Sequence, residues 1–133
     1  MIFTLTIEND PSSKMTTIDI EDLNLISCAP TLTDAENDLR DIIKKQMDID
    51  SVDFDFNNGH LKLNELNSKA TVYILRQFKN QHKGLTFDKM AKDLGYENSS
   101  GVSPYFQFRE QRMPSIAMFS KLCNYLGHSI RVS

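Results

Sequence analysis

The 133-residue sequence predicts an α+β protein in which a β-β-β-α-β domain precedes an all-α domain with a short terminal strand. Apolar and polar residues alternate at the N-terminus and again near residue 54, which is the period of a half-buried strand. Apolar residues recur at helical spacing once in the first half and four times in the second. The charge divides in the same way. Residues 1–66 hold five Lys and Arg and fourteen Asp and Glu, a charge of -9, whereas residues 67–133 hold ten and four, a charge of +6.

Three strands are expected before the first helix. They are residues 2–7, the segment that carries Met15, Ile18 and Ile20, and residues 23–29. A turn over residues 9–13 separates the first two strands, because it contains Asn, Asp, Pro and Ser. Pro30 ends the third strand.

A helix follows, with a capping box at its start. Thr33 is expected at the N-cap and Glu36 at the third helical position, so that each side chain satisfies a backbone N–H of the other. The apolar stripe of this helix is Ala35, Leu39, Ile42, Ile43 and Met47. A fourth strand is then indicated by Val52, Phe54 and Phe56, and the residues 57–59 that follow are typical of a turn. The predicted division is a domain over 1–59, a connector over 60–67 and a second domain over 68–133.

The second domain is predicted to contain four helices. The first runs from Ser68 to about Gln81, with Ala70, Ile74, Leu75 and Phe78 inside. The next has Thr86 at its N-cap, Phe87, Met90, Ala91 and Leu94 on its apolar face, and Gly95 at its end. A third helix carries Val102, Tyr105 and Phe106 on its buried side and begins near Ser103 or is distorted there, because Pro104 lacks an N–H. The last begins at Pro114 and Ser115, buries Ile116, Phe119, Leu122, Cys123 and Leu126, and stops at Gly127. Residues 128–132 are expected to form a short strand.

The second half resembles the repressor-type helix-turn-helix of phage repressors and antitoxins. The resemblance rests on the run from Ala91 to Gly95, on Val102 and Phe106, and on the helix that ends at Gly127. It implies that this domain binds duplex operator DNA. Ser99, Ser100, Ser103 and Gln107 flank the buried pair and are the expected base readers. The expected phosphate contacts are Lys83, Lys89, Lys92, Arg109 and Arg112. Capping by the serines and solvation of the cations are the structural alternatives.

Nearly the whole chain is similar to HicB-type antitoxins. The first-half segment from Ile20 to Cys28 leads through Thr31 and Thr33 into a helix with Ala35, and the second half has Ser68 and Lys69 before the helix-turn-helix. The chain lacks the prolines and the glycine that the family usually has in the first segment. The resemblance implies a degenerate RNase H-like domain that covers a small basic ribonuclease toxin of the HicA type. It also implies that the second domain represses the operon.

The acidic first domain is expected to bind that toxin through Asp19, Glu21, Asp22, Asp53 and Asp55, because an RNA-cleaving protein needs a cationic surface. These carboxylates could instead form a divalent-metal cluster, as in nucleases. Asp53 and Asp55 alternate with apolar residues, however, which favours a solvated sheet face, so neither catalysis nor a cofactor is expected. Cys28 and Cys123 are expected to be buried free thiols without a metal role.

The predicted function is therefore that of an antitoxin that neutralises a ribonuclease and represses its own operon. The alternative is a phage-type repressor whose first domain oligomerises or senses a ligand. No apolar run approaches the ~18 residues of a membrane span, so a cytoplasmic protein without a membrane partner is expected. Two half-domains of this size also predict a homodimer or a larger assembly.

Overall fold

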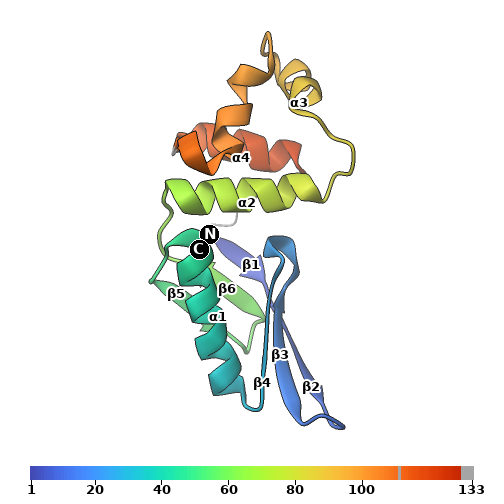
Figure 1. The fold of residues 1–133 in the computed structure, drawn as a ribbon, viewed down its shortest axis with the longest axis vertical. Coiled ribbons are helices and arrows are strands. Elements are labelled where there is room, and N and C mark those ends of the chain that lie inside the picture. Colours follow the sequence, from blue (N-terminus) through green and yellow to red (C-terminus); the bar gives the residue numbers. More distant parts are fainter. Residues whose placement is uncertain (111, 130–133) are drawn as a thin grey trace. The chain divides into compact units, whose positions relative to one another are not determined.

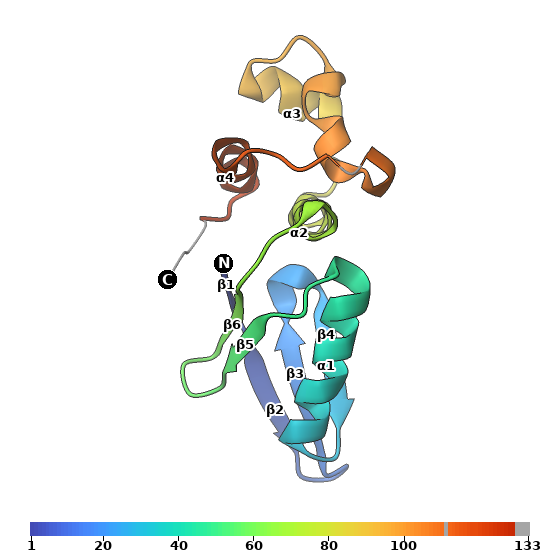
Figure 2. The same cartoon turned by 90° about the vertical axis from the view of Figure 1, so that its left-hand side faces the viewer.

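The computed structural model describes residues 1–110 and 112–129, and the chain divides into two compact units, residues 1–66 and residues 67–129. The described residues contain four α-helices and two three-stranded antiparallel sheets, so the predicted α+β class is confirmed. Figure 1 and Figure 2 show the ribbon from two sides. Most of the strand expected at 128–132 lies outside the described residues, and His128 and Ser129 are not in a strand.

The first unit contains both sheets. One sheet has the strand order β1-β6-β5, made of β1 (Ile2–Thr4), β6 (His60–Leu63) and β5 (Val52–Asp55). The other has the order β2-β3-β4, made of β2 (Thr6–Asp10), β3 (Met15–Ile20) and β4 (Leu25–Ala29). A short 3₁₀ turn, Glu21–Leu23, precedes β4 where a longer strand was expected.

The first predicted strand is in fact two strands that belong to different sheets. Leu5 separates β1 from β2, is buried, and donates its N–H to the carbonyl of Gly59 at 2.8 Å. Because β1 pairs with β6 and β2 pairs with β3, the chain passes from one sheet to the other at this residue. Gly59 has a φ of 67°, and a Cβ there would lie 3.1 Å from the Leu5 carbonyl oxygen. The junction therefore favours glycine at this turn.

The connector predicted over 60–67 was wrong in its first half. His60–Leu63 forms β6, the central strand of its sheet, and pairs with both β1 and β5. Leu61 and Leu63 are buried while His60 and Lys62 are half-buried, so the segment has the alternation of a strand. A strand of four residues gives only a short alternating pattern, and the neighbouring polar residues favoured the prediction of a connector.

The N-cap of helix α1 (Leu32–Met47) lies two residues before the predicted one. Thr31, not Thr33, is the N-cap, because its backbone is extended and its Oγ accepts the N–H of Asp34 at 3.1 Å. The expected stripe is buried at Ala35, Leu39, Ile43 and Met47, whereas Ile42 is half-buried. The helix covers β3 and β4, and Ser27 of β4 donates its hydroxyl to the Ala35 carbonyl at 2.8 Å. Figure 2 shows the helix along these two strands.

The second unit contains α2 (Ser68–Asn80), α3 (Phe87–Leu94) and α4 (Ile116–Tyr125). Each has a polar N-cap side chain that accepts a backbone N–H three residues later, and the caps are Asn67, Thr86 and Ser115. Gly95 and Gly127, with φ of 85° and 90°, follow the last residues of α3 and α4 as the sequence predicts. The predicted apolar residues of α2 are buried, and α2 packs against α4.

The α-helix predicted around Val102 to Phe106 does not form. The chain makes three consecutive 3₁₀ turns instead: η2 (Ser99–Gly101), η3 (Ser103–Phe106) and η4 (Phe108–Glu110). Pro104 cannot donate an N–H inside a helix, and Gln107 is extended, so no α-helical ladder can continue. Val102 and Phe106 are nevertheless buried as expected. This departure removes the second helix of the expected helix-turn-helix.

Two further side chains lie on the opposite side from the one predicted. Ile116 is 88% exposed, because it begins α4 beyond the residues Phe119, Leu122 and Cys123 that enter the core. Cys28 is exposed, because β4 turns Leu25, Ser27 and Ala29 inward and its alternate residues outward. Cys123 is buried as predicted, and this burial raises the pKa of its thiol to about 12. Both cysteines are free.

Candidate nucleic-acid interface and acidic surface

The predicted base readers lie along the 3₁₀ turns and do not share an α-helical face. Ser99 and Ser100 are in η2 and Ser103 is in η3, whereas Gln107 stands between η3 and η4. The Ser100 hydroxyl and N–H both bind the carboxamide oxygen of Asn98, which is an ordinary turn contact. The side chains of Ser99, Ser103 and Gln107 are half-buried. A regular helix inserted into a major groove therefore cannot present these four residues.

The predicted phosphate contacts differ in how much of their charge is free. Lys89 donates to both carboxylate oxygens of Asp93 at 2.9 Å, so this carboxylate offsets its charge. Arg109 is exposed, with its Nε 3.3 Å from Gln107 Oε1 and 3.9 Å from Glu110 Oε1. The guanidinium of Arg112 lies 5.3 Å from the centre of the Tyr105 ring. Lys83 and Lys92 are also exposed.

Asp93 joins α3 to α4 through Tyr125. The Tyr125 hydroxyl donates to Asp93 Oδ2 at 2.6 Å, on the carboxylate that also binds Lys89. The hydrogen bond from Tyr125, followed by the one from Lys89, lowers the pKa of Asp93. Burial, and then the hydrogen bond to Asp93, raises the pKa of Tyr125 to about 12. The contact is therefore a charge-assisted hydrogen bond between a carboxylate and a neutral phenol.

Two of the predicted cations share a cavity of about 620 Å³ in the second unit. Its lining consists of His82, Lys83, Gly84, Leu85, Thr86, Lys89 and Tyr125. His82 Nε2 lies 2.7 Å from the Leu126 carbonyl oxygen, and because a carbonyl only accepts, the imidazole donates there. The side chain of His82 thus ties the end of α2 to the end of α4. Lys92, Arg109 and Arg112 do not line this cavity.

Sequence reasoning missed a set of cations that lie over aromatic rings. In the second unit the distances from the cation to the ring centre are 5.1 Å for Arg76 and Phe108, 4.7 Å for Lys79 and Phe87, and 5.0 Å for Lys121 and Tyr96. Arg112 and Tyr105 form a fourth such pair. Arg76 and Phe108 are 32 positions apart in the sequence, so no local pattern could have indicated this pair. A ring attracts a cation through its quadrupole without cancelling its charge.

The five acids proposed for toxin binding are divided between the two sheets of the first unit. Asp53 and Asp55 lie on β5, directly across the ladder from Lys62 and His60. Asn64 donates to Asp53 at 2.8 Å. Asn58 donates to Asp55 through its side chain at 2.7 Å, and this hydrogen bond is the main reason that the pKa of Asp55 is lowered.

The other three proposed acids lie on the second sheet. Asp19 is on β3, opposite Thr6 and Ile26, and Glu21 and Asp22 are in the 3₁₀ turn that follows. The structure therefore does not bring the five carboxylates into one cluster. Within residues 1–110 and 112–129, no group of three or more His, Cys, Asp or Glu is placed to hold a metal ion.

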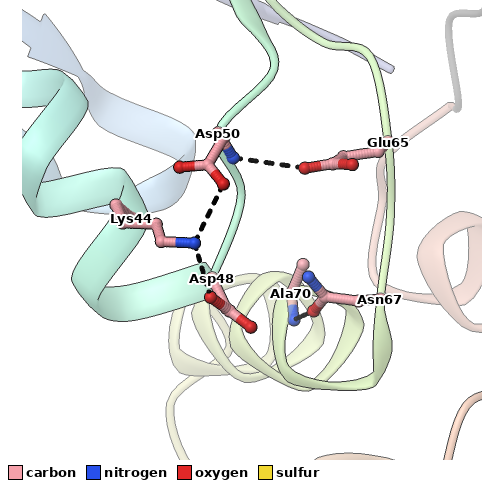
Figure 3. Close-up of polar contacts among 6 residues, drawn as sticks. All are labelled: Lys44, Asp48, Asp50, Glu65, Asn67 and Ala70. Carbon is pink, nitrogen blue, oxygen red and sulfur yellow. Dashed lines mark hydrogen bonds and ion pairs between the residues drawn. The ribbon is translucent and has the colours of Figure 1, made fainter.

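Other acids of the first unit extend its negative surface over α1. Asp34, Asp38 and Asp41 are exposed at helical spacing, so they share the solvent face of the helix. Near the C-terminus of the helix, Lys44 binds Asp48 at 2.9 Å and Asp50 at 3.0 Å. The hydrogen bond to Asp48, followed by the one to Asp50, raises the pKa of Lys44. The backbone N–H of Asp50 donates to Glu65 Oε1 at 3.2 Å (Figure 3). The spacing of the helix acids is visible in the sequence. The sequence-based prediction nevertheless assigned toxin binding only to acids outside this helix.

Comparison of the chain with models of known protein families gives no match, and comparison with curated proteins gives none either. Within the described residues, every helix is too short or too polar to cross a bilayer.

Proposed function

We propose that the chain is an antitoxin-type regulator that acts in the cytoplasm. Its acidic unit captures a small basic ribonuclease toxin, and its basic unit binds operator DNA. The observation that supports the proposal best is that the charge changes sign where the chain divides. The first unit ends at Leu66, and the charge is -9 through residue 66 and +6 from residue 67 onward. Two compact units of opposite charge suit two partners of opposite charge.

The acidic unit is proposed to bind the toxin through both of its negative surfaces. The candidates are the sheet acids Asp19, Glu21, Asp22, Asp53 and Asp55 and the α1 acids Asp34, Asp38 and Asp41. Asp53 and Asp55 have polar or cationic cross-strand neighbours, so the α1 acids contribute more to the long-range field. In this proposal the two sheets and α1 are a degenerate form of an RNase H-like domain, with no catalytic role. A carboxylate surface would compete with RNA for the toxin's cations.

The basic unit is proposed to bind duplex DNA as part of a homodimer. Cations that neutralise phosphates release counterions, so binding would weaken steeply with salt. Lys83, Lys92, Arg109 and Arg112 are the proposed phosphate contacts, whereas Lys89 is less available because of Asp93. The 3₁₀ turns would contact the groove edge with Gln107 and the nearby serines. Half-sites one helical turn apart, about 34 Å, would match a two-fold dimer.

A mobility-shift titration with the promoter DNA tests the second half of the proposal. The apparent affinity should fall at least about tenfold between 50 and 200 mM salt. Arg112→Ala should weaken binding to all sequences alike, while Gln107→Ala should change the sequence preference. Affinity that does not vary with salt would contradict a phosphate-dominated mode.

Co-expression with the product of the neighbouring gene tests the first half. The intact chain should relieve the toxicity of that product and co-purify with it. The triple variant Asp34→Asn/Asp38→Asn/Asp41→Asn should bind it with a slower association rate, because rim charges mainly steer the encounter. Asp88→Asn, an exposed acid in the second unit, is the matched control. If the intact chain neither binds nor protects, the antitoxin function is wrong, and the phage-type repressor becomes the working hypothesis.

A further inference from the structure

We infer that the second unit carries a surface for the unpaired bases of single-stranded nucleic acid, in addition to any duplex site. This arginine–aromatic surface is defined by Arg76, Tyr105, Phe108, Arg109 and Arg112. It draws on α2, on the turns η3 and η4, and on the chain just after η4. The inference does not depend on the proposed recognition of an operator.

The surface combines one exposed and one half-buried ring with guanidinium groups that lie over them. Phe108 is 39% exposed, and the guanidinium of Arg76 lies 5.1 Å from its ring centre. Tyr105, three residues earlier, is half-buried and has Arg112 at 5.3 Å from its ring centre. Both rings and the guanidinium of Arg112 therefore occur within eight residues of chain, from 105 to 112, and the second guanidinium, that of Arg76, comes from α2.

The charge of this surface is largely uncancelled. Among residues 1–110 and 112–129, the carboxylate that forms an ion pair with it is Glu110, whose Oε1 is 3.9 Å from Arg109 Nε, at the limit of such a pair. Arg109 is 83% exposed at its side chain, so this contact is strongly screened by water. Arg76 and Arg112 lie over rings, which keep their positive charge available. Three cations can therefore meet phosphates beside two aromatic rings.

Unpaired bases fit this arrangement better than paired ones. A base in a duplex presents only its edges to a protein, whereas an unstacked base presents a flat face that can stack on a ring or a guanidinium. The 3₁₀ turns also do not provide the continuous helix that enters a major groove. Aromatic rings interleaved with cations are the usual means by which proteins bind single strands with little sequence preference.

Fluorescence anisotropy with a labelled single strand of about 15 nucleotides, and with the duplex of the same sequence, tests the inference. Phe108→Ala in the full-length protein should lower the single-strand affinity about tenfold and the duplex affinity much less. Phe108→Trp should keep the affinity within about twofold, because it preserves the stacking face. Ile116→Ala, which removes another exposed apolar side chain of this unit, should change neither affinity. Circular dichroism spectra and thermal midpoints establish that each variant is folded.

The outcomes separate this surface from the proposed operator site. If the wild type binds the single strand and not the duplex, the inference holds and operator binding fails. If it binds only the duplex, the inference is overturned and operator binding stands. An equal loss on both substrates for Phe108→Ala would mean that Phe108 has only a structural role. An unchanged single-strand affinity for Phe108→Ala, with a loss for Arg109→Gln, would mean that the surface gathers phosphates and reads no bases.

Discussion

Arg40 and Lys44 of the first unit bind carboxylates, whereas most held cations in the second unit lie over aromatic rings. In the first unit Arg40 binds Glu36 at 3.1 Å, and Lys44 binds Asp48 and Asp50. In the second unit the ring-bound cations are Arg76, Lys79, Arg112 and Lys121, while Lys89 with Asp93 is the close ion pair. Arg40 shows both arrangements, because its guanidinium also lies 4.9 Å from the Phe54 ring centre.

This difference explains how a small unit can hold its cations in place and still be strongly positive. A carboxylate partner fixes a cation but cancels its field, whereas a ring fixes it by dispersion and its quadrupole and leaves the charge in place. The second unit, residues 67–129, has only four Asp and Glu to offer, against nine Lys and Arg. The first unit has the opposite imbalance, so its few cations all have carboxylates near them in sequence. The partners of the cations therefore follow from the composition of each unit.

The largest predicted effect tests whether the two units are separate structures, as the comparison assumes. Phe78 is buried in the second unit, with the His128 ring stacked 3.7 Å away. Phe78→Ala should lower the free energy of unfolding of that unit by about 3–5 kcal/mol, because it leaves a cavity. Hydrogen exchange of individual amides measures this loss in residues 67–129.

The control for this variant is the first unit of the same molecule. The amides of β3 and α1 should keep their exchange free energies when Phe78 is replaced. Ile18→Ala, which leaves a cavity at a similarly buried position in the first unit, should lower the exchange free energies of that unit and leave those of the second unit unchanged. A similar loss in both units for either variant would show that the chain unfolds as one cooperative body.

Helix caps sharpen the comparison, because both units use them in the same way. Thr31→Ala should cost the first unit about 1 kcal/mol, since the N–H of Asp34 loses its acceptor. Thr33→Ala should cost close to nothing, although the sequence pattern places the cap there. Urea unfolding of the two variants decides between the residues. A larger loss for Thr33→Ala would move the start of α1 to the predicted position.

The two kinds of cation partner should differ in their response to salt. Glu36→Gln removes the carboxylate of Arg40 and should cost about 0.3–0.5 kcal/mol at low salt and less at high salt. Lys79→Met keeps the apolar stem over Phe87 and removes the charge, at a cost of about 0.5 kcal/mol that should depend little on salt. Unfolding at two ionic strengths measures both. Equal salt dependence would remove the distinction.

The smallest expected effect is a pH dependence in the second unit. The lowered pKa of Asp93 means that its contribution is present above its ordinary value of 3.8 and is lost as the pH falls through its folded value. The raised pKa of Tyr125 means that its contribution is present below 10.0 and is lost as the pH rises toward about 12. The difference in thermal midpoint between the wild type and Tyr125→Phe should therefore be constant in the neutral range and shrink at both extremes. A difference that peaks at an extreme would contradict this assignment.

Local signals predicted most of the fold, because several elements are determined by residues close together in the sequence. Thr86, with Gly95 nine residues later, defines α3 correctly, and Ser115 with Gly127 defines α4. The predictions of secondary structure are wrong where contacts between residues distant in the sequence determine the structure. Leu5 leaves its ladder because Gly59 accepts its N–H, and β6 is a strand because β1 and β5 lie on either side of it. Neither partner can be identified from the local sequence.

The sequence predicted the charge of each candidate surface but not the positions of its residues relative to one another. The acidic residues were correctly assigned to the first half, but pairing places Asp19 and Asp53 on different sheets. The cation–ring pairs escaped prediction, because the sequence does not show which ring a long side chain reaches. Pro104 was recognised as an obstacle to the second motif helix, and the structure resolves it as 3₁₀ turns. A proline is a local signal, but it does not indicate that Asn98 accepts the N–H of Ser100 or that the Tyr96 side chain leaves no room for a Cβ at Gly101.

The passage of the chain from one sheet to the other at Leu5 has a consequence for the order in which the first unit folds. Strands β2 and β3 pair from Asp10 and Met15 outward, five residues apart, whereas β1 pairs Ile2 with Lys62, sixty residues away. Closing the longer loop costs about 2 kcal/mol more, so we expect the β2–β3 hairpin to form first and β1 to join last. On the ribosome, β1 would wait without its partner until residue 63 has emerged from the exit tunnel. Pulse-labelling of amides during refolding measures this order, and protection of β1 before β3 would reverse it.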